Sequence, residues 1–256
     1  MRIPNNTLLQ GLRRELERVL PPSNTLALGK RAARFSGRRE VALGLSTYAG
    51  YLLVRALVVD DRGRERAARN ARRVCELEQR LGLHVGPRVQ SRLLPHRRLL
   101  AALGVGYVAA NVLVTVGWLM LLYRRRDPRF HRLRRALVLA TLGAQPAYLV
   151  FPCAPPRTQD GFVDTVNDVL DLDSGLIVRL YNPIAAMPSM HMSFAVVTGV
   201  GMAEAGRSRW TRTLGVAYPL SIFGVVLGTA NHYVLDGVAG SALALAGLRL
   251  SRALEV

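Results

Sequence analysis

Six long apolar segments, separated by short polar or charged ones, dominate the chain. They cover residues 41–60, 99–123, 136–152, 188–205, 213–230 and 233–250. A helix needs roughly 20 apolar residues to cross the hydrocarbon core of a bilayer, and each segment approaches or reaches that length. The pattern predicts an all-α integral membrane protein, a bundle of six transmembrane helices. Arg55 interrupts the first segment, but near a helix end its side chain can extend to the interface.

A shorter periodicity lies between the first two predicted spans, in residues 61–98. Apolar side chains recur there at helical spacing, and arginines lie beside them: Ala67, Ala71, Val74, Leu77 and Leu81, with Arg66, Arg69, Arg72, Arg73 and Arg80. This pattern is typical of an amphipathic helix lying in the headgroup layer of a membrane. A solvated helix packed on the loops is the alternative.

The arginines indicate the orientation of the chain in the membrane. Basic residues are concentrated in 1–40, 124–135, 207–212 and the tail 251–256, which six spans would place on one side. The positive-inside rule predicts that this side is cytoplasmic. The opposite side receives the mostly acidic segment 152–187, together with 61–98, whose arginines are an exception to the rule. A catalytic domain is therefore expected at 41–250, with its motifs at 136–240 facing outward.

The charge and composition of the chain limit the classes of binding partner that we expect. The net charge is +18, Lys30 is the only lysine, and aromatic residues make up 6% of the chain. No nucleic-acid-binding motif accompanies this charge, so we expect no nucleic-acid partner and assign the arginines to anionic membrane lipids. Cys75 and Cys153 lie far apart and lack metal-ligand spacing, which neither requires a disulfide nor indicates a metal site.

Two histidines stand where apolar segments meet the membrane boundary. His191 lies at the start of the fourth segment, and His232 at the start of the sixth, four residues before Asp236. On one helix face, Asp236 can hydrogen-bond one ring nitrogen of His232 and leave the other free, as a nucleophile or base requires. A polar pair that only fixes helix packing is the alternative.

Two further segments lead to the same boundary. Prolines at 152, 155 and 156 end the third span and leave Arg157 at the interface, where its planar fork suits a phosphate group or anchors a headgroup. Pro188 and Ser189 are typical helix-start residues, which would place His191 in the first turn of a helix, where anions are favoured.

The motifs APPR at 154–157, AAMPSMH at 185–191 and NHYVLDGVAG at 231–240 occur in this order on the predicted spans. In these motifs the chain resembles the type 2 phosphatidic acid phosphatase superfamily. It is more closely similar to the branch related to inositol phosphorylceramide synthases. The resemblance covers roughly residues 40–250.

The resemblance implies a role for each motif residue. His232 would attack phosphorus and form a phosphohistidine, Asp236 would orient it, and His191 would protonate the leaving oxygen and then act as base. Arg157 would hold phosphoryl oxygens, and no metal or other cofactor is implied. The candidate substrate-binding residues are Arg157, Tyr181, Asn182, Ser189 and Asn231.

The chain departs from the phosphatase pattern of that superfamily at two positions. A lysine before the first motif is missing, and Val226 stands where an arginine precedes the nucleophile by six residues. Asn231, Thr229, Tyr181 or Asn182 could supply substitute donors. Relatives in the inositol-transferase branch also depart from the pattern, so the loss favours that branch.

These observations lead to an expected function and its alternatives. We expect a phosphotransferase or phosphatase acting on a phospholipid or lipid-linked phosphate at the outer leaflet of a bacterial plasma membrane. The donor could also be a lipid-linked phosphodiester, including a phosphoinositol-type donor. The acceptor would be an alcohol such as inositol or another polyol, or else water. The alternatives from other classes are a bis-histidine haem or metal protein and a non-catalytic scaffold. The oligomeric state is left open.

Overall fold

The computed structural model describes residues 35–164 and 182–254. It contains eight α-helices in these residues: α2 (Gly37–Val58), α3 (Asp61–Arg80), α4 (Gly86–Leu93), α5 (Arg97–Arg124), α6 (Arg129–Val150), α8 (Met190–Ala205), α9 (Arg209–Gly228) and α10 (Val234–Ala253). One 3-10 turn, η1 (Pro156–Thr158), follows α6. The all-α prediction is confirmed, because the described residues hold no strand and only an isolated bridge between Cys153 and Ala185.

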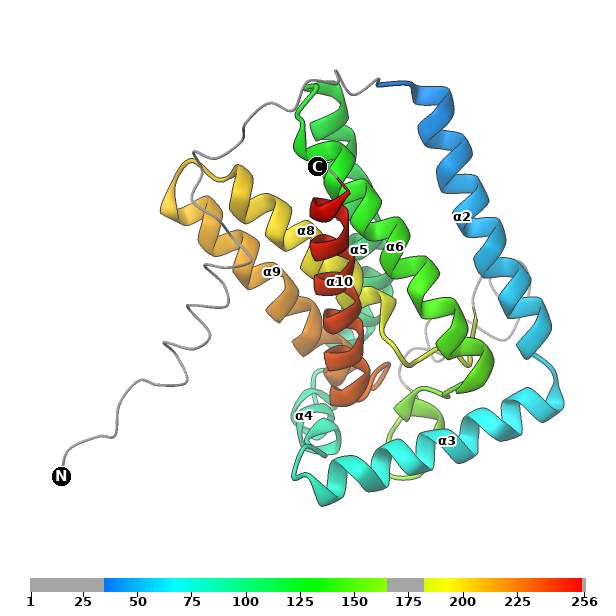
Figure 1. The fold of residues 1–256 in the computed structure, drawn as a ribbon. Coiled ribbons are helices and arrows are strands. Elements are labelled where there is room, and N and C mark those ends of the chain that lie inside the picture. The colour runs from blue at the N-terminus through cyan, green and yellow to red at the C-terminus, as the bar shows by residue number, and fades with distance from the viewer. Residues whose placement is uncertain (1–34, 165–181, 255–256) are drawn as a thin grey trace.

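Six long helices occupy the six predicted apolar segments, and α8 lies among α5, α6, α9 and α10 (Figure 1). Small residues permit a close contact between α8 and α9. A Cβ atom on Gly199 would lie 2.4 Å from the carbonyl oxygen of Gly215. Such close backbone approach is typical of helices packed within membranes.

Three of the described helices, α2, α9 and α10, are long and apolar enough to cross a membrane. This supports an integral membrane protein. Helices α6 and α8 are not among them, because α6 begins with a strongly basic turn and α8 has 16 residues. The count of six spans therefore stays a prediction.

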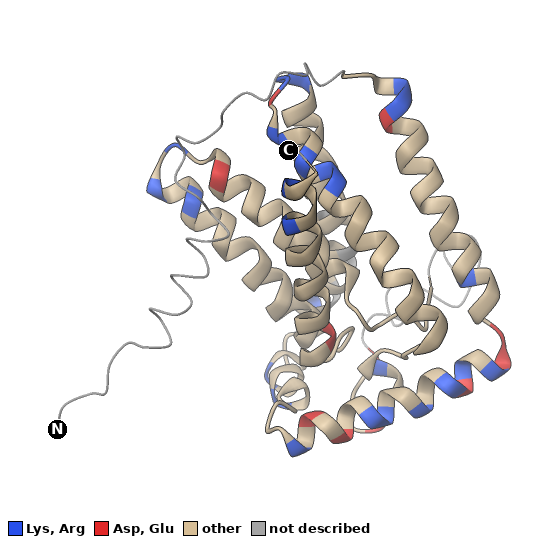
Figure 2. Ribbon diagram, viewed as in Figure 1, with Lys and Arg blue, Asp and Glu red and all other residues tan. Residues whose placement is uncertain are grey.

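Arginines gather at one end of the bundle, where α2 begins, α10 ends and two helix connections lie (Figure 2). Glu204 on α8 joins these elements. Its carboxylate pairs with Arg132 and, at 3.0 Å, with Arg252, while its backbone oxygen accepts from Arg129 Nη1 at 2.8 Å. The described parts of 124–135, 207–212 and the tail therefore lie at one end of the bundle, whereas the arginine-rich helix α3 (Asp61–Arg80) lies at the other. Residues 1–34 lie outside the described residues, and α10 extends to Ala253, into the predicted tail.

Helix α3 crosses the opposite end of the bundle (Figure 1). Asp60 caps it by accepting a hydrogen bond from Gly63 N at 2.6 Å. Its buried face follows the predicted stripe only as far as Val74. Beyond that, Leu77 and Leu81 are 46% and 56% exposed, whereas Glu78 is 2% exposed. After Val74 the protein-facing side of α3 therefore includes Glu78 in place of Leu77 and Leu81, and the position of the two leucines in the headgroup layer stays a prediction.

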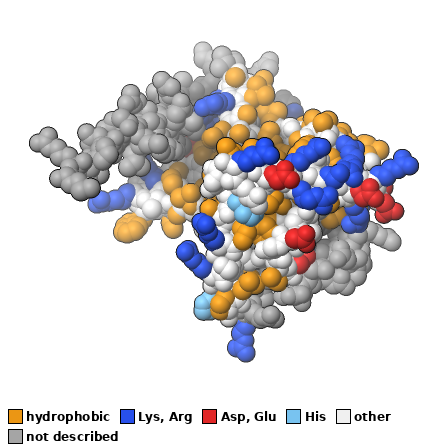
Figure 3. All heavy atoms as spheres, turned by 90° about the horizontal axis from the view of Figure 1, so that it is seen from below, with side chains coloured by type: hydrophobic (Ala, Val, Ile, Leu, Met, Phe, Trp, Pro, Cys, Tyr) orange, Lys and Arg blue, Asp and Glu red, His pale blue; other side chains and the backbone are white. Residues whose placement is uncertain are grey.

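The buried face of α3 packs against residues of the connecting loops, including Cys153, Ile184 and Tyr233. This is the packing described by the alternative in which the helix lies on the loops. Its exposed face carries arginines, which Figure 3 shows on the underside of the molecule with a few acidic side chains among them. Contact with lipid headgroups stays a prediction.

Candidate active site

Backbone hydrogen bonds bring the three motif segments together beside α3. Cys153 N donates to Ile184 O at 2.8 Å, which joins the first motif segment to the second. Arg157 N donates to Ala230 O at 2.8 Å, which joins the first to the third. Segments separated by more than 70 residues in sequence thus form one site.

His232 lies in the short loop before α10, and Asp236 lies in the first turn of that helix. Asp236 Oδ2 accepts from Tyr233 N at 2.9 Å and lies 3.4 Å from His232 Nδ1. The expected pairing is present, but its stated geometric reason was wrong. The two residues do not share a helix face. Instead, Asp236 caps the helix start and so lies beside the preceding imidazole.

His191 occupies the first turn of α8, as the sequence predicts. Ser189 begins this helix: its Oγ accepts from Met192 N at 3.3 Å, and its backbone N donates to Asp236 O at 3.0 Å. Asn111 on α5 donates through Nδ2 to His191 O at 3.0 Å. The start of α8 is therefore attached to both α10 and α5.

The two imidazoles contact each other directly, with His191 Nδ1 3.1 Å from His232 Nε2. If His232 Nδ1 donates to Asp236, its Nε2 is an acceptor, so we assign the intervening hydrogen to His191 Nδ1. This tautomer leaves a lone pair on His232 Nε2, directed at His191. A phosphoryl group can be held between the two rings only after this contact opens.

Arg157 is buried, and it lies beside the loop that carries His232. Its Nε donates to Asn231 Oδ1 at 3.1 Å, and its Nη1 pairs with Asp164 Oδ2 at 2.7 Å. Asn231 in turn donates through Nδ2 to Thr229 Oγ1 at 2.8 Å. Asn231 therefore connects Arg157 to the end of α9, and both of its amide ends are engaged.

The remaining sequence candidates differ in what they can offer a substrate. Asn182 is 3% exposed, and its Oδ1 accepts from Ile184 N at 3.1 Å. Its Nδ2 has no hydrogen-bond partner among the described residues. Ser189 is 0% exposed, and its hydroxyl is engaged as a helix cap, so it positions His191 rather than facing a ligand. Tyr181 lies outside the described residues.

Val226, where the related sequences carry an arginine, is fully buried in an apolar cluster with Ile222 and Met192. Its carbonyl oxygen accepts from Asn231 N at 2.9 Å and from His232 N at 3.2 Å. The position supports the loop that carries His232 through its backbone. The side chain offers nothing to a phosphate.

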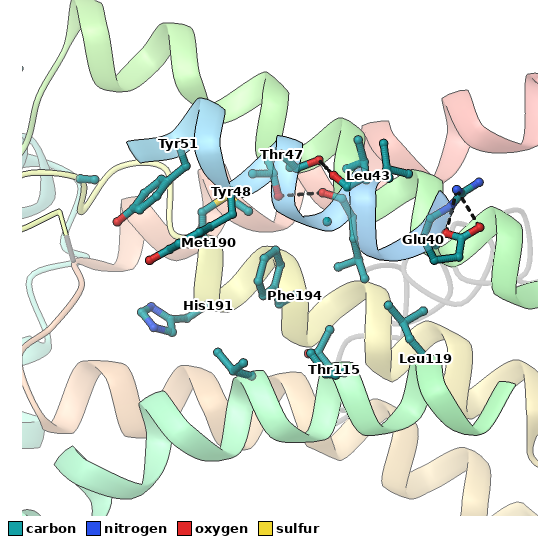
Figure 4. A pocket seen from close by; sticks show the side chains of 18 of the residues that line it. Glu40, Leu43, Thr47, Tyr48, Tyr51, Thr115, Leu119, Met190, His191 and Phe194 are labelled. Atoms are coloured by element: carbon teal, nitrogen blue, oxygen red, sulfur yellow. Dashed lines mark hydrogen bonds and ion pairs between the residues drawn. The ribbon is translucent and has the colours of Figure 1, made fainter. Parts of the chain in front are cut away.

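Both histidines line a cavity of about 780 Å³. Figure 4 shows His191 in this cavity. Asn182, Asn231 and Pro155 line it near His191 and His232, and α2, α5, α6 and α8 supply largely apolar walls farther away. Such a cavity offers two chemically different regions. One holds imidazoles and amides suited to a phosphate, and the other suits hydrocarbon.

The structure adds residues near the site that sequence reasoning missed. Tyr107 places its ring 4.8 Å from that of His191, and Glu78 accepts from Leu235 N at 2.8 Å, at the start of α10. Burial raises the pKa of Glu78 to about 7, although its hydrogen bond with Leu235 opposes the shift. Glu78 continues the spacing of Ala67, Ala71 and Val74, and a carboxylate on that stripe was the available signal.

Comparison with known proteins gives one match. No curated protein and no solved structure matches the chain. A family model described as the PAP2 superfamily matches residues 72–250, a range that contains all three motifs. The chain belongs to the PAP2 superfamily, whose members are phosphatases or phosphotransferases.

Proposed function

We propose that this protein transfers a phosphoryl group from a lipid-linked phosphate or phosphodiester, through a phosphohistidine on His232. The observation that carries the proposal is the contact of His191 with His232, whose other nitrogen faces Asp236, at one end of an apolar cavity. Membership of a superfamily that acts on lipid phosphates supports the substrate class.

In the first step, His232 Nε2 attacks phosphorus in line with the departing ester oxygen. The P–N bond forms as the P–O bond breaks, and His191 gives a proton to the leaving oxygen. Asp236 is 0% exposed, so its negative charge is held beside the ring that becomes positive. In this dry setting a fixed carboxylate stabilises the developing charge strongly.

In the second step, His191 accepts a proton from water or an alcohol, whose oxygen attacks phosphorus. The P–N bond then breaks and returns His232 to its neutral form. Asn182 Nδ2 can donate to a phosphoryl oxygen, since the residue lines the cavity and this amide is unpartnered. Arg157 can do so if the phosphate replaces Asp164 as its acidic partner.

An alcohol such as inositol or another polyol is the acceptor we favour. The resemblance to the branch related to inositol phosphorylceramide synthases supports this choice, as does Val226 in place of the phosphatase arginine. Hydrolysis is the competing outcome, because water can attack the same intermediate.

The proposal includes an arrangement in the membrane. Six helices would cross it, α3 would lie in the headgroup layer, and the site would face outward. The position of the arginine-rich end opposite the histidines supports this arrangement. A lipid phosphate could then reach the site from the outer leaflet.

Trapping the intermediate tests the proposed chemistry. Purified protein in detergent is incubated with phosphatidic acid radiolabelled in its phosphate, and then denatured in alkali, which preserves phosphohistidine. We expect labelled protein from the wild type and from His96→Ala, an exposed histidine at the start of α5. We expect none from His232→Ala, and at least about a hundredfold slower turnover from Asp236→Asn.

The products then separate transfer from hydrolysis. Adding inositol should convert the label into a phosphoinositol product if the acceptor is a polyol. Inorganic phosphate as the sole product with every alcohol tried would contradict the transferase assignment. Undiminished labelling of His232→Ala would show that another residue is the nucleophile.

A further inference from the structure

The cavity that holds the histidines continues along α2 (Figure 4). Leu43, Thr47 and Tyr48 of α2 lie on one side of it, facing Leu119 of α5 and Phe194 of α8. These walls are largely apolar. Burying a polar headgroup against these walls would therefore be unfavourable, whereas a hydrocarbon chain would bury apolar surface against other apolar groups.

The length of this region matches one leaflet of a membrane. Glu40, at its far end, lies eleven residues before Tyr51, near the histidine end, which corresponds to about 16 Å of helix. The hydrocarbon core of a bilayer is about 30 Å thick, so one leaflet contributes about half of that. The cavity is thus long enough for a hydrocarbon chain of ordinary length.

An ion pair lies near the far end, where Gly37 and Phe130 also line the cavity. Arg134 Nη1 lies 3.0 Å from Glu40 Oε2 and 3.3 Å from Oε1, and the two side chains are only 20% and 15% exposed. Methylene groups pushed against this pair would remove its remaining water without replacing those hydrogen bonds, which is costly.

Helix α2 is attached on either side of the cavity wall. Near the histidines, Tyr51 Oη accepts from Asn182 N at 2.9 Å, and Val54 packs with Tyr148. At the other end, Glu40 holds Arg134 of α6. Between these attachments lies Gly44, where an added Cβ atom would meet nothing within 4 Å.

We propose that one hydrocarbon chain of the lipid substrate occupies this cavity, and that the Glu40–Arg134 pair limits the length of chain accepted. This rests on the proposed function, which places the lipid's phosphate at His191 and His232. Gly44 is then a position that controls entry into the far half, because a larger side chain there projects into open space.

Photo-crosslinking tests the position of the chain without requiring turnover. Alkyl phosphates of increasing length, each with a diazirine on the terminal carbon, are irradiated with the protein, and labelled peptides are mapped by mass spectrometry. Short chains should label the region of Thr47 and Thr115, and long ones the region of Glu40 and Tyr123. Labelling that stays on bilayer-facing positions, such as Leu220 (66% exposed), whatever the chain length, would overturn the proposal.

Two glycines on α2 provide a matched pair of variants. Gly44→Leu should lower far-end labelling by the longest chains at least about tenfold, because it adds bulk to the cavity. Gly50→Leu should leave the pattern unchanged, because Gly50 lies outside the cavity lining and an added Cβ there also meets nothing within 4 Å. Equal patterns for the two variants would contradict the proposal.

The ion pair is tested by removal and by reversal. Replacing both residues, Glu40→Leu with Arg134→Leu, should extend labelling and turnover to longer chains, whereas Glu40→Arg with Arg134→Glu should retain the wild-type limit. If the folded double-leucine variant shows the same dependence of labelling and turnover on chain length as the wild type, the ion pair does not limit chain length. If the double-leucine variant fails to fold, the pair of glycine variants still tests the position of the hydrocarbon chain.

The outcomes distinguish this inference from the proposed function. Length-dependent labelling without phosphoryl transfer would refute the proposed function alone, and transfer without such labelling would refute this inference alone.

Discussion

Two buried polar atoms at the site have no hydrogen-bond partner among the described residues: Asn182 Nδ2 and Asp236 Oδ1. Leaving such groups unpaired costs about 1–3 kcal/mol each, and most buried polar atoms in proteins are paired. Both lie within residues to which the proposed chemistry gives a use. The amide is a donor available to a phosphoryl oxygen, and the carboxylate has acceptor capacity beside His232.

Glu78 makes the stability of the protein depend on pH. Its pKa is raised from 4.5 to about 7 in the folded protein, so the folded state retains a proton that the unfolded chain loses. Its stabilising contribution is complete below about pH 4.5 and is lost as the pH rises through about 7. The change in the free energy of unfolding is at most about 3.5 kcal/mol, since one pKa unit is worth about 1.4 kcal/mol.

The measurement is Tm against pH in detergent for the wild type and two variants. Glu78→Gln should remove this part of the pH dependence, because the amide oxygen can still accept from Leu235 N. Glu76→Gln, on the exposed face of the same helix, should retain it. The assignment fails if the wild type and Glu78→Gln lose Tm in parallel between pH 4.5 and 7.5.

At the scale of elements, the crossing of α10 with the start of α8 positions both histidines. Ser193 Oγ donates to Gly240 O at 2.7 Å, and a Cβ atom on Gly240 would lie 2.1 Å from Ser189 O. Neither partner is a flexible side-chain end, so Gly240→Ala must push the helices apart. We expect the free energy of unfolding to fall by about 1–3 kcal/mol, measured through Tm. We also expect turnover, measured as the initial rate, to fall because the start of α8 carries His191.

Gly117→Ala is the matched control, because an added Cβ there meets nothing within 4 Å. Alanine favours helix by up to about 1 kcal/mol over glycine, so this variant should be as stable as the wild type or slightly more so. Identical Tm and rate for the two alanine variants would mean that the crossing tolerates added volume.

The helices could be predicted from the sequence because the length of an apolar segment limits what it can form in a membrane. The motif residues could be predicted as one site for a different reason, their resemblance to a known family. Their contacts could not: the pairing of His232 with Asp236 depends on a helix that begins at Val234, between them. Spacing alone does not reveal a helix boundary at that precision.

Glu78 and Asp164 illustrate what the sequence does not reveal. Each is one acidic residue among several in a charged segment, and its function depends on a partner far away in sequence or on a loop: Leu235 N for Glu78, and Arg157 for Asp164. Local patterns carry information about burial. They carry little about which distant group a buried carboxylate meets.

For the whole molecule, the proposed orientation can be measured by labelling single cysteines. In a Cys75→Ser background, Asp160→Cys near the site should react with a membrane-impermeant maleimide in intact cells. Arg207→Cys, in the exposed connection at the arginine-rich end, should react only after permeabilisation. The reverse pattern would mean that the orientation in the membrane is the opposite of the one proposed. Labelling of both cysteines in intact cells would contradict an arrangement that places the two ends of the bundle on opposite sides of the membrane.

The contact between Ser189 and Gly240 has a mechanical consequence for the molecule. Because Ser189, which starts α8, contacts the backbone of α10, His191 and His232 are attached to the same pair of helices. Bending of the outer helices, as when a bilayer thins or stretches, would shift both imidazoles together. We therefore expect the distance between the two imidazoles to change less with bilayer thickness than the shape of the proposed lipid cavity, one wall of which is α2.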